Sequence, residues 1–138
     1  MKQILLITLA FNTLLLADFT KNGNTVTDSA TGLQWQDDTV GYQMQWKAAI
    51  AHCEALSLDG HNDWRLPNAH ELNSIVDKRR YAPSIDPVFE HTASSYYWSS
   101  SSHANGASHA WYVGFNYGYQ GNYSKYNSHY VRCVRAGQ

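Results

Sequence analysis

The pattern of apolar and polar positions separates a short leader from the rest of the chain. An apolar, Leu-rich run of 13 residues, Ile4–Leu16, follows Lys2 and is followed by the small residue Ala17. This arrangement is typical of a signal peptide, and the run is shorter than the about 20 residues that a bilayer span needs. We therefore expect residues 1–17 to be a signal peptide and residues 18–138 to be a single exported domain without a membrane span, located in the periplasm, outside the cell or on its surface. A buried first strand and an uncleaved anchor are the alternatives.

Short runs of β-forming residues follow the leader. Phe19–Lys21 and Thr25–Thr27 flank the turn residues Asn22–Asn24, which predicts a β-hairpin. Another turn at Thr31–Gly32 precedes Leu33–Trp35, which reads as a third short strand.

Two segments have helical periodicity. The first runs from about Gln45 to Leu58, and we expect Gly60 to end it. Its predicted apolar face comprises Trp46, Ile50, Cys53 and Leu56. The second begins after Asn68, which with Glu71 forms a capping-box pattern. Its predicted apolar side comprises Leu72, Ile75 and Val76. We also expect Arg65 to be partly buried and paired with Asp63 or Glu71.

The remainder of the chain reads as irregular structure followed by strands. Residues Lys78–Thr92 include two prolines and predict a loop, and Tyr96–Ser99, His109–Phe115 and Tyr130–Arg135 predict strands joined by Gly- and Asn-rich turns. Two helices followed by small antiparallel sheets make an α+β domain. The residues expected in its core here are Trp98, Trp111, Tyr112, Val113 and Phe115.

Composition changes sharply along the chain. All 11 acidic residues lie at or before Glu90, whereas Tyr, Ser, Asn, Gly and His supply 27 of the 36 residues at 95–130. Tyrosine combined with small polar residues is the composition of binding loops, and aromatic rings also suit the apolar faces of sugars. The alternative is a tyrosine-rich sheet whose rings form core and cross-strand pairs. We expect a recognition surface within residues 114–129, and its candidate contact residues are Tyr117, Tyr119, Asn122, Tyr123, Tyr126 and Asn127.

Several kinds of chemistry find little support in the sequence. A net charge of −1 argues against binding to nucleic acid, and the lack of carboxylates after Glu90 argues against calcium-mediated sugar binding. No zinc-protease or Gly-x-Ser-x-Gly motif is present. We expect no catalytic residue, metal or cofactor. Export would place Cys53 and Cys133 in an oxidising compartment, where a disulfide is favoured over two inert buried thiols.

Five motifs in order resemble the C-terminal domain of bacterial collagen-like adhesins, the Lcl C-terminal domain family. They are Thr31–Trp35, Asp63–Asn68 with Glu71–Leu72, Tyr97–Ser100, Ala110–Val113 and Val131–Arg135. The resemblance implies a C-type-lectin-like fold related to formylglycine-generating and sulfatase-modifying enzymes. It also implies a bridge from the first helix to the last strand, which suits Cys53 and Cys133, and an association with sulfated glycosaminoglycans and trimers.

These observations together favour a binding protein over an enzyme. We expect a secreted or surface-associated, adhesin-like module that recognises an extracellular glycan, sulfated or neutral, or a cell-surface protein, and a homo-oligomer is compatible with this role. An enzyme of the formylglycine-generating type and a structural subunit of a surface appendage are the alternatives. Residues 116–130 also resemble the variable segments of lectin-like proteins that retroelements diversify.

Overall fold

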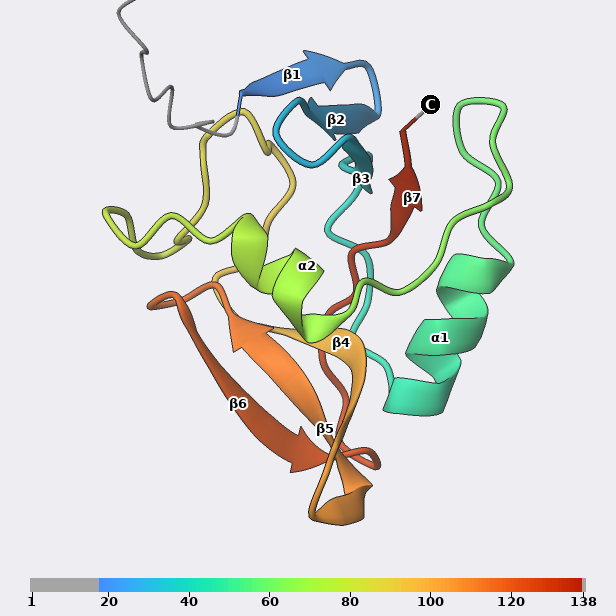
Figure 1. The fold of residues 1–138 in the computed structure, drawn as a ribbon, viewed down its shortest axis with the longest axis vertical. Coiled ribbons are helices and arrows are strands. Elements are labelled where there is room, and N and C mark those ends of the chain that lie inside the picture. Colours follow the sequence, from blue (N-terminus) through green and yellow to red (C-terminus); the bar gives the residue numbers. More distant parts are fainter. Residues whose placement is uncertain (1–17, 138) are drawn as a thin grey trace, which may run out of the picture.

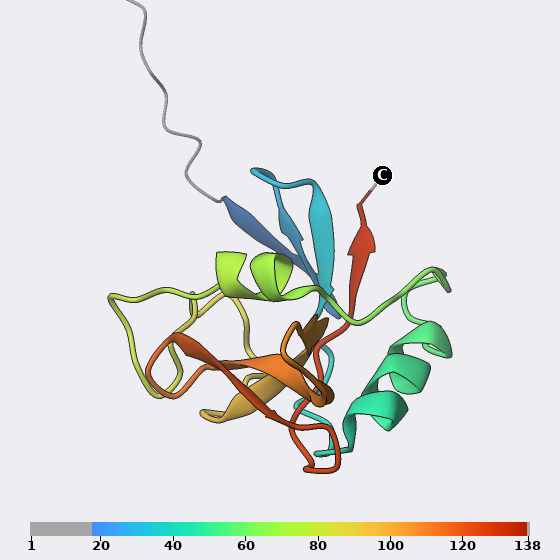
Figure 2. The same cartoon turned by 60° about the horizontal axis from the view of Figure 1, so that its bottom comes forward.

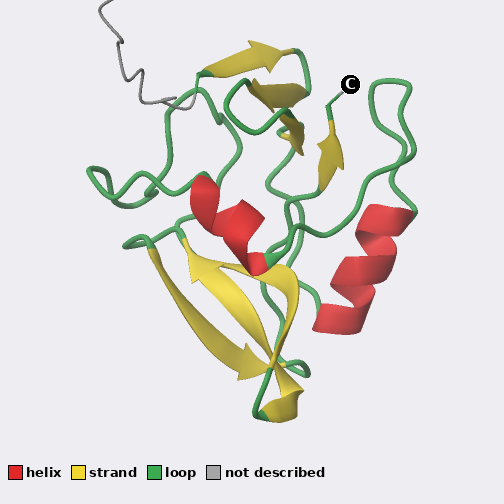
Figure 3. Cartoon of the chain, viewed as in Figure 1, coloured by secondary structure: helices red, strands yellow, loops and turns green. Residues whose placement is uncertain are grey.

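The computed structural model describes residues 18–137, so the expected signal peptide lies outside the described residues. The described part is α+β, as predicted, with two helices and two small antiparallel sheets (Figures 1 and 3). In chain order the elements are β1 (Phe19–Asn22), β2 (Thr25–Asp28), β3 (Leu33–Gln36), α1 (Trp46–Glu54), α2 (Ala69–Ser74), β4 (Tyr96–His103), β5 (Gly106–Gly114), β6 (Tyr119–Ser124) and β7 (Val134–Ala136). Neither helix in residues 18–137 has the length and apolar character needed to cross a membrane.

The two sheets lie on either side of α2. One has the strand order β1-β2-β3-β7 and the other the order β4-β5-β6. In Figures 1 and 2, α2 lies between them and α1 lies beside the three-stranded sheet and β7. The predicted hairpin of β1 and β2 and the short strand β3 are confirmed, and β7 returns to pair with β3.

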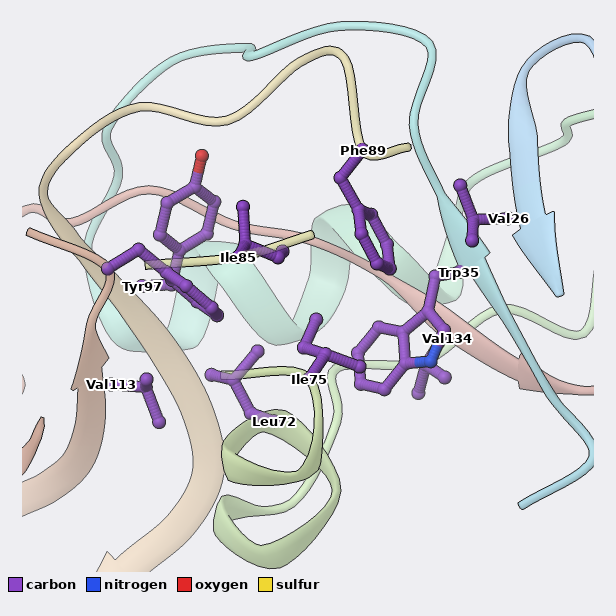
Figure 4. Packing of buried hydrophobic residues seen from close by; sticks show 10 residues of the cluster. Val26, Trp35, Leu72, Ile75, Ile85, Phe89, Tyr97, Val113 and Val134 are labelled. Carbon is purple, nitrogen blue, oxygen red and sulfur yellow. The ribbon is translucent and has the colours of Figure 1, made fainter. Parts of the chain in front are cut away.

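The larger apolar core joins α2 to both sheets. Trp35 and Val134 come from the four-stranded sheet, Leu72 from α2, Ile75 from the position directly after α2, and Val113 from β5 (Figure 4). The remaining buried members are Val26, Ile85, Phe89, Tyr97 and Phe115. The apolar side predicted for α2 is therefore confirmed for Leu72 and Ile75, while Val76 is half-buried.

The capping box at α2 is confirmed. The Asn68 side chain accepts a hydrogen bond from the Glu71 amide at 2.8 Å, and the Glu71 carboxylate accepts one from the Asn68 amide at 2.9 Å. Glu71 also accepts two hydrogen bonds from Arg65, at 2.6 and 2.7 Å. Of the two acids proposed for Arg65, the structure selects Glu71, because Asp63 binds Arg135 instead. The Arg65 side chain is 45% exposed, so it is only partly covered, in line with the expected partial burial.

A disulfide fastens α1 to the chain just before β7. Cys53 and Cys133 are bonded, with their Cα atoms 5.4 Å apart, and both are fully buried. The second apolar cluster surrounds them, with Ala49, Trp64, Leu66, Trp98, Ala110, Tyr112 and Val131 as its other buried members. The helix is shorter than predicted and ends at Glu54. Gly60 does not end it; instead, Asp59 and Gly60 form a tight turn with positive φ values of 52° and 78°, closed by Leu58 and His61.

The C-terminal strands differ most from the prediction. The sequence predicts Gly- and Asn-rich turns before the last strand, but Tyr119–Ser124 form strand β6, although Gln120, Gly121 and Asn122 show no apolar alternation. It forms because it pairs with β5 over six consecutive positions. The last strand is only three residues long, and Tyr130 instead forms an isolated parallel bridge with Tyr97.

The core expectation is confirmed for Trp98, Tyr112, Val113 and Phe115, which are at most 8% exposed. It is wrong for Trp111, which is only half-buried. Trp111 lies opposite Asn122 on β6, and its ring packs against His103 with centroids 5.1 Å apart. The sequence pattern assigned Trp111 to the interior, but its side chain lies on a partly exposed face of the three-stranded sheet.

Candidate functional site

Strand register gathers tyrosines on one side of the three-stranded sheet. Tyr96 of β4 and Tyr119 of β6 flank Gly114, and Tyr123 lies opposite Ala110. Residues that are direct partners, or two positions apart, project from the same side of a sheet. Tyr96, Tyr112, Tyr119 and Tyr123 therefore share one side, which we call the tyrosine face.

The rings of the tyrosine face support one another. Tyr96 and Tyr112 are stacked with centroids 4.3 Å apart, and the hydroxyls of Tyr96 and Tyr119 lie 3.1 Å apart. Tyr112 also covers Gly121, where a Cβ atom would lie 2.5 Å from the Tyr112 hydroxyl. Tyr119 and Tyr123 remain 43% and 42% exposed. The face thus presents two half-exposed rings on a packed aromatic base.

Two phenol groups of this face, those of Tyr112 and Tyr119, stay uncharged. Burial raises the pKa of Tyr112, and the neighbouring Tyr119 and Tyr123 raise it further. The hydrogen bond with Tyr96 raises the pKa of Tyr119, with burial adding to it. Because ordinary tyrosine already has a pKa of about 10, these hydroxyls remain neutral at pH 7 and can both donate and accept hydrogen bonds.

His129 lies beneath the tyrosine face. Its ring centroid is 4.5 Å from that of Trp98 and 5.1 to 5.8 Å from those of Tyr96, Tyr112 and Tyr123. The side chain is 7% exposed, and its Nε2 atom has no hydrogen-bond partner among the described residues. Burial lowers the pKa of His129, so the ring under the face is neutral at pH 7.

The six residues proposed from the sequence do not lie on one surface. Tyr119 and Tyr123 lie on the tyrosine face, whereas the Asn122 side chain projects from the opposite side and its Oδ1 lies 2.9 Å from Nδ1 of His109. Tyr117, 71% exposed, lies in the turn before β6, and Tyr126, 78% exposed, lies in the turn after it, next to the exposed Asn127. Six strand residues span about 20 Å, so the two turns are well separated.

A small aromatic and basic pocket lies at the C-terminal end of β6. It has a volume of about 230 Å³, and Trp46, Lys47, Lys125 and Tyr126 are among its lining residues. The Lys125 ammonium lies 4.1 Å from the centre of the Trp46 ring and donates hydrogen bonds to Ser102 Oγ at 2.8 Å and to the Ala107 carbonyl at 2.6 Å. The sequence pattern missed this pocket, because Trp46 fits the apolar face of α1 and Lys125 is far from it in the chain.

The sequence also gave no signal for two exposed tyrosines outside the C-terminal segment. Tyr42 and Tyr81 are 85% and 76% exposed. Within residues 18–137, no group of three or more His, Cys, Asp or Glu side chains is placed to hold a metal ion, and both cysteines are in the disulfide.

Comparison with known protein families identifies the family of this chain. No curated protein matches the chain. The family model described as the Lcl C-terminal domain matches residues 24–135, which includes all five motifs named above and both cysteines. This match covers most of the sequence, and the chain belongs to the Lcl C-terminal domain family.

Proposed function

We propose that this protein is an exported, surface-associated binding module that recognises an extracellular glycan through the tyrosine face and performs no catalysis. The observation that carries the proposal is the pair of half-exposed rings, Tyr119 and Tyr123, held on the stacked rings of Tyr96 and Tyr112. Such rings lose little conformational freedom on binding, because their positions are already fixed.

The chemistry of the face matches a sugar ring. A pyranose has apolar C–H faces and hydroxylated edges, and tyrosine offers an apolar ring with a hydroxyl at its tip. Neutral phenols at Tyr112 and Tyr119 supply donors and acceptors without the desolvation cost of a charge. These properties favour stacking with directional hydrogen bonds to hydroxyl groups.

The pocket beside β6 extends the same proposal to glycans with acidic substituents. Lys47 and Lys125 line it together with Trp46 and Tyr126, so it pairs positive charge with aromatic surface. A sulfate or carboxylate on a sugar would find an ammonium group there, and salt would weaken this part of the binding. We therefore expect sulfated glycans to bind at least as well as neutral ones.

A glycan array tests the proposal directly. Wild-type protein is applied to neutral and sulfated glycans with and without a chelator, and then compared with the Tyr119→Ala/Tyr123→Ala variant. Removal of a ring that anchors a ligand typically costs about 1–3 kcal/mol, so we expect at least a tenfold loss of affinity that the chelator does not change. Tyr42→Ala, which removes an exposed ring from the loop before α1, is the matched control.

Two outcomes would contradict the proposal. If the double variant bound glycans as tightly as the wild type, the glycan would not be recognised by the tyrosine face. Capture of cells that survives enzymatic removal of their surface glycans would instead indicate a cell-surface protein as the partner.

A further inference from the structure

The edge strands of the two sheets differ in how far other parts of the chain cover their outer main-chain groups. The outer side of β4 is covered by Tyr130, whose amide binds the Tyr96 carbonyl at 2.9 Å and whose carbonyl accepts from the Trp98 amide at 3.0 Å. Next to β7, Arg65 exchanges two main-chain hydrogen bonds with Val134, each 2.9 Å long. Strand β1 is four residues long and carries Lys21. Strand β6 forms the remaining margin, and no other described strand lies beside its outer side (Figure 1).

The hydrogen-bond pattern shows which main-chain groups of β6 point outward. The Lys125 amide binds the Ser108 carbonyl at 2.8 Å, so the main-chain amide of Lys125 points toward β5. This bond determines which residues of β6 direct their main-chain groups toward β5. In an antiparallel pair, alternate residues direct their amide and carbonyl groups to the same neighbour. Tyr119, Gly121 and Tyr123 therefore face β5 with their main chain, and the outward main-chain groups are those of Gln120, Asn122 and Ser124.

The sequence of β6 lacks the features that normally protect a sheet edge. Proteins protect exposed edges with charged residues, prolines, bulges or very short strands. Residues 119–124 contain neither a charge nor a proline, and their register with β5 is continuous over six positions. An open, uncharged and regular strand of this kind is a site for further strand pairing.

We propose that β6 pairs antiparallel with β6 of a second copy of this chain, about a twofold axis at Asn122. In this register Asn122 lies opposite the second copy's Asn122, and Gln120 lies opposite the second copy's Ser124. All three outward residues of each strand then face one another, which is the arrangement of hydrogen-bonded antiparallel pairs. The Ser124 carbonyl already accepts the Asn127 amide, so the Asn122 pair at the centre holds the two strands most directly.

The same register is compatible with the side chains. Tyr123 lies opposite Gly121 of the second copy, where it meets the Tyr112 hydroxyl that covers this glycine. Lys125 lies opposite Tyr119, so no like charges face one another across the axis. A twofold axis perpendicular to the sheet places both tyrosine faces on the same side of a six-stranded sheet. The pairing thus goes beyond the proposed function by joining two binding surfaces into one.

Sedimentation velocity over a concentration series, without any ligand, tests the pairing. We expect wild-type protein to reach twice the mass of a single chain. Both Asn122→Lys and Asn122→Asp place like charges directly opposite each other at the axis, so each variant alone should remain a monomer where the wild type is a dimer. A mixture of the two variants should restore the dimer, since the charges are then opposite. Asn105→Lys, in the exposed turn between β4 and β5, is the matched control.

A second variant separates pairing from folding. Asn122→Pro removes an outward amide and leaves the ladder with β5 in place, because proline is tolerated where an edge strand faces solvent. We expect it to be a monomer with wild-type near-ultraviolet circular dichroism. A wild-type protein that stays monomeric at every concentration, or lysine and aspartate variants that each remain dimeric, would overturn the proposal. Neither result bears on the tyrosine face, which the glycan array tests separately.

Discussion

Two groups of polar side chains in this protein satisfy their hydrogen bonds in different ways. Lys21, Asp37 and Arg132 form a buried charge cluster next to the four-stranded sheet, whereas the tyrosine face is uncharged and half-exposed. The Asp37 carboxylate is fully buried and binds Lys21, Arg132 and the amides of Glu90 and His91. Its acceptors are therefore occupied within the chain.

Arg132 extends the charge cluster into the loop before β4. Its guanidinium donates to the Gln36 carbonyl, to the His91 carbonyl at 2.7 Å and to the Thr92 hydroxyl at 2.7 Å. It also lies 5.0 Å from the centre of the Phe89 ring. One cation thus fixes a loop without regular structure to the end of β3. The buried charges thus stabilise the fold, whereas the half-exposed rings of Tyr119 and Tyr123 are the ones that we propose for recognition.

Arg132→Met should give the largest effect on stability. It leaves the Asp37 carboxylate buried with one partner fewer and removes the contacts to the loop. Removing one member of a buried ion pair typically costs about 3–5 kcal/mol. Urea denaturation measures the free energy of unfolding. Arg79→Met, whose side chain is 90% exposed, is the control and should leave the free energy of unfolding nearly unchanged. Similar changes in the free energy of unfolding for the two variants would contradict the idea that the buried charge cluster stabilises the fold more than surface charges do.

The second prediction concerns His129. We expect this residue to make the free energy of unfolding depend on pH, with an effect of intermediate size. Burial lowers the pKa of His129 below its usual value of 6.5, so the folded protein keeps this ring neutral where the unfolded chain takes up a proton. The free energy of unfolding therefore falls as the pH drops below about 6.5, and the fall ends below the folded-state pKa. The rings packed around His129 belong to Tyr96, Tyr112, Tyr123 and Trp98, none of which supplies a carboxylate or an ammonium group that would offset this effect.

Urea denaturation at a series of pH values between 5 and 8 measures this slope. His129→Gln should unfold with a smaller loss of stability on acidification than the wild type, even where it is less stable overall. The lowered pKa of Asp37 contributes only at lower pH. Burial raises that pKa, but hydrogen bonds from Lys21 and the Glu90 amide, together with the charge of Arg132, outweigh burial. Its contribution is lost as the pH falls through the folded-state pKa, below 3.8. Identical slopes for the variant and the wild type above pH 5 would contradict the assignment to His129.

The parts of the fold that depend on local chemistry could be predicted from the sequence. The hairpin turn, the capping box of Asn68 and Glu71 and the apolar side of α2 are set by residues close together in the chain. The disulfide followed from the number of cysteines and the expected export. Strand β6 could not be predicted in this way, because its residues have no apolar alternation and are held by the ladder with β5.

The candidate site was predictable only in part, because it too depends on strand pairing and not on local sequence alone. Composition pointed to tyrosines in the C-terminal segment, and Tyr119 and Tyr123 are indeed at the surface of one sheet. Composition could not show that Asn122 projects from the other side, since side-chain direction depends on strand register. The contact between Trp46 and Lys125 depends on tertiary structure alone.

The partly exposed pair of Arg65 and Glu71 should give the smallest effect, which sharpens the comparison with the charge cluster. Its bidentate geometry resembles that of a strong ion pair, and the hydrogen bonds from Arg65 lower the pKa of Glu71. Because solvent screens it, Arg65→Met should cost less than about 1 kcal/mol in urea denaturation. Glu71→Gln should behave alike, since an amide oxygen still accepts from Asn68. Glu71→Ala also loses this side of the capping box and should cost up to about 1 kcal/mol more. If Arg65→Met lowered the free energy of unfolding as much as Arg132→Met, burial would not determine how much an ion pair contributes to the stability of this fold.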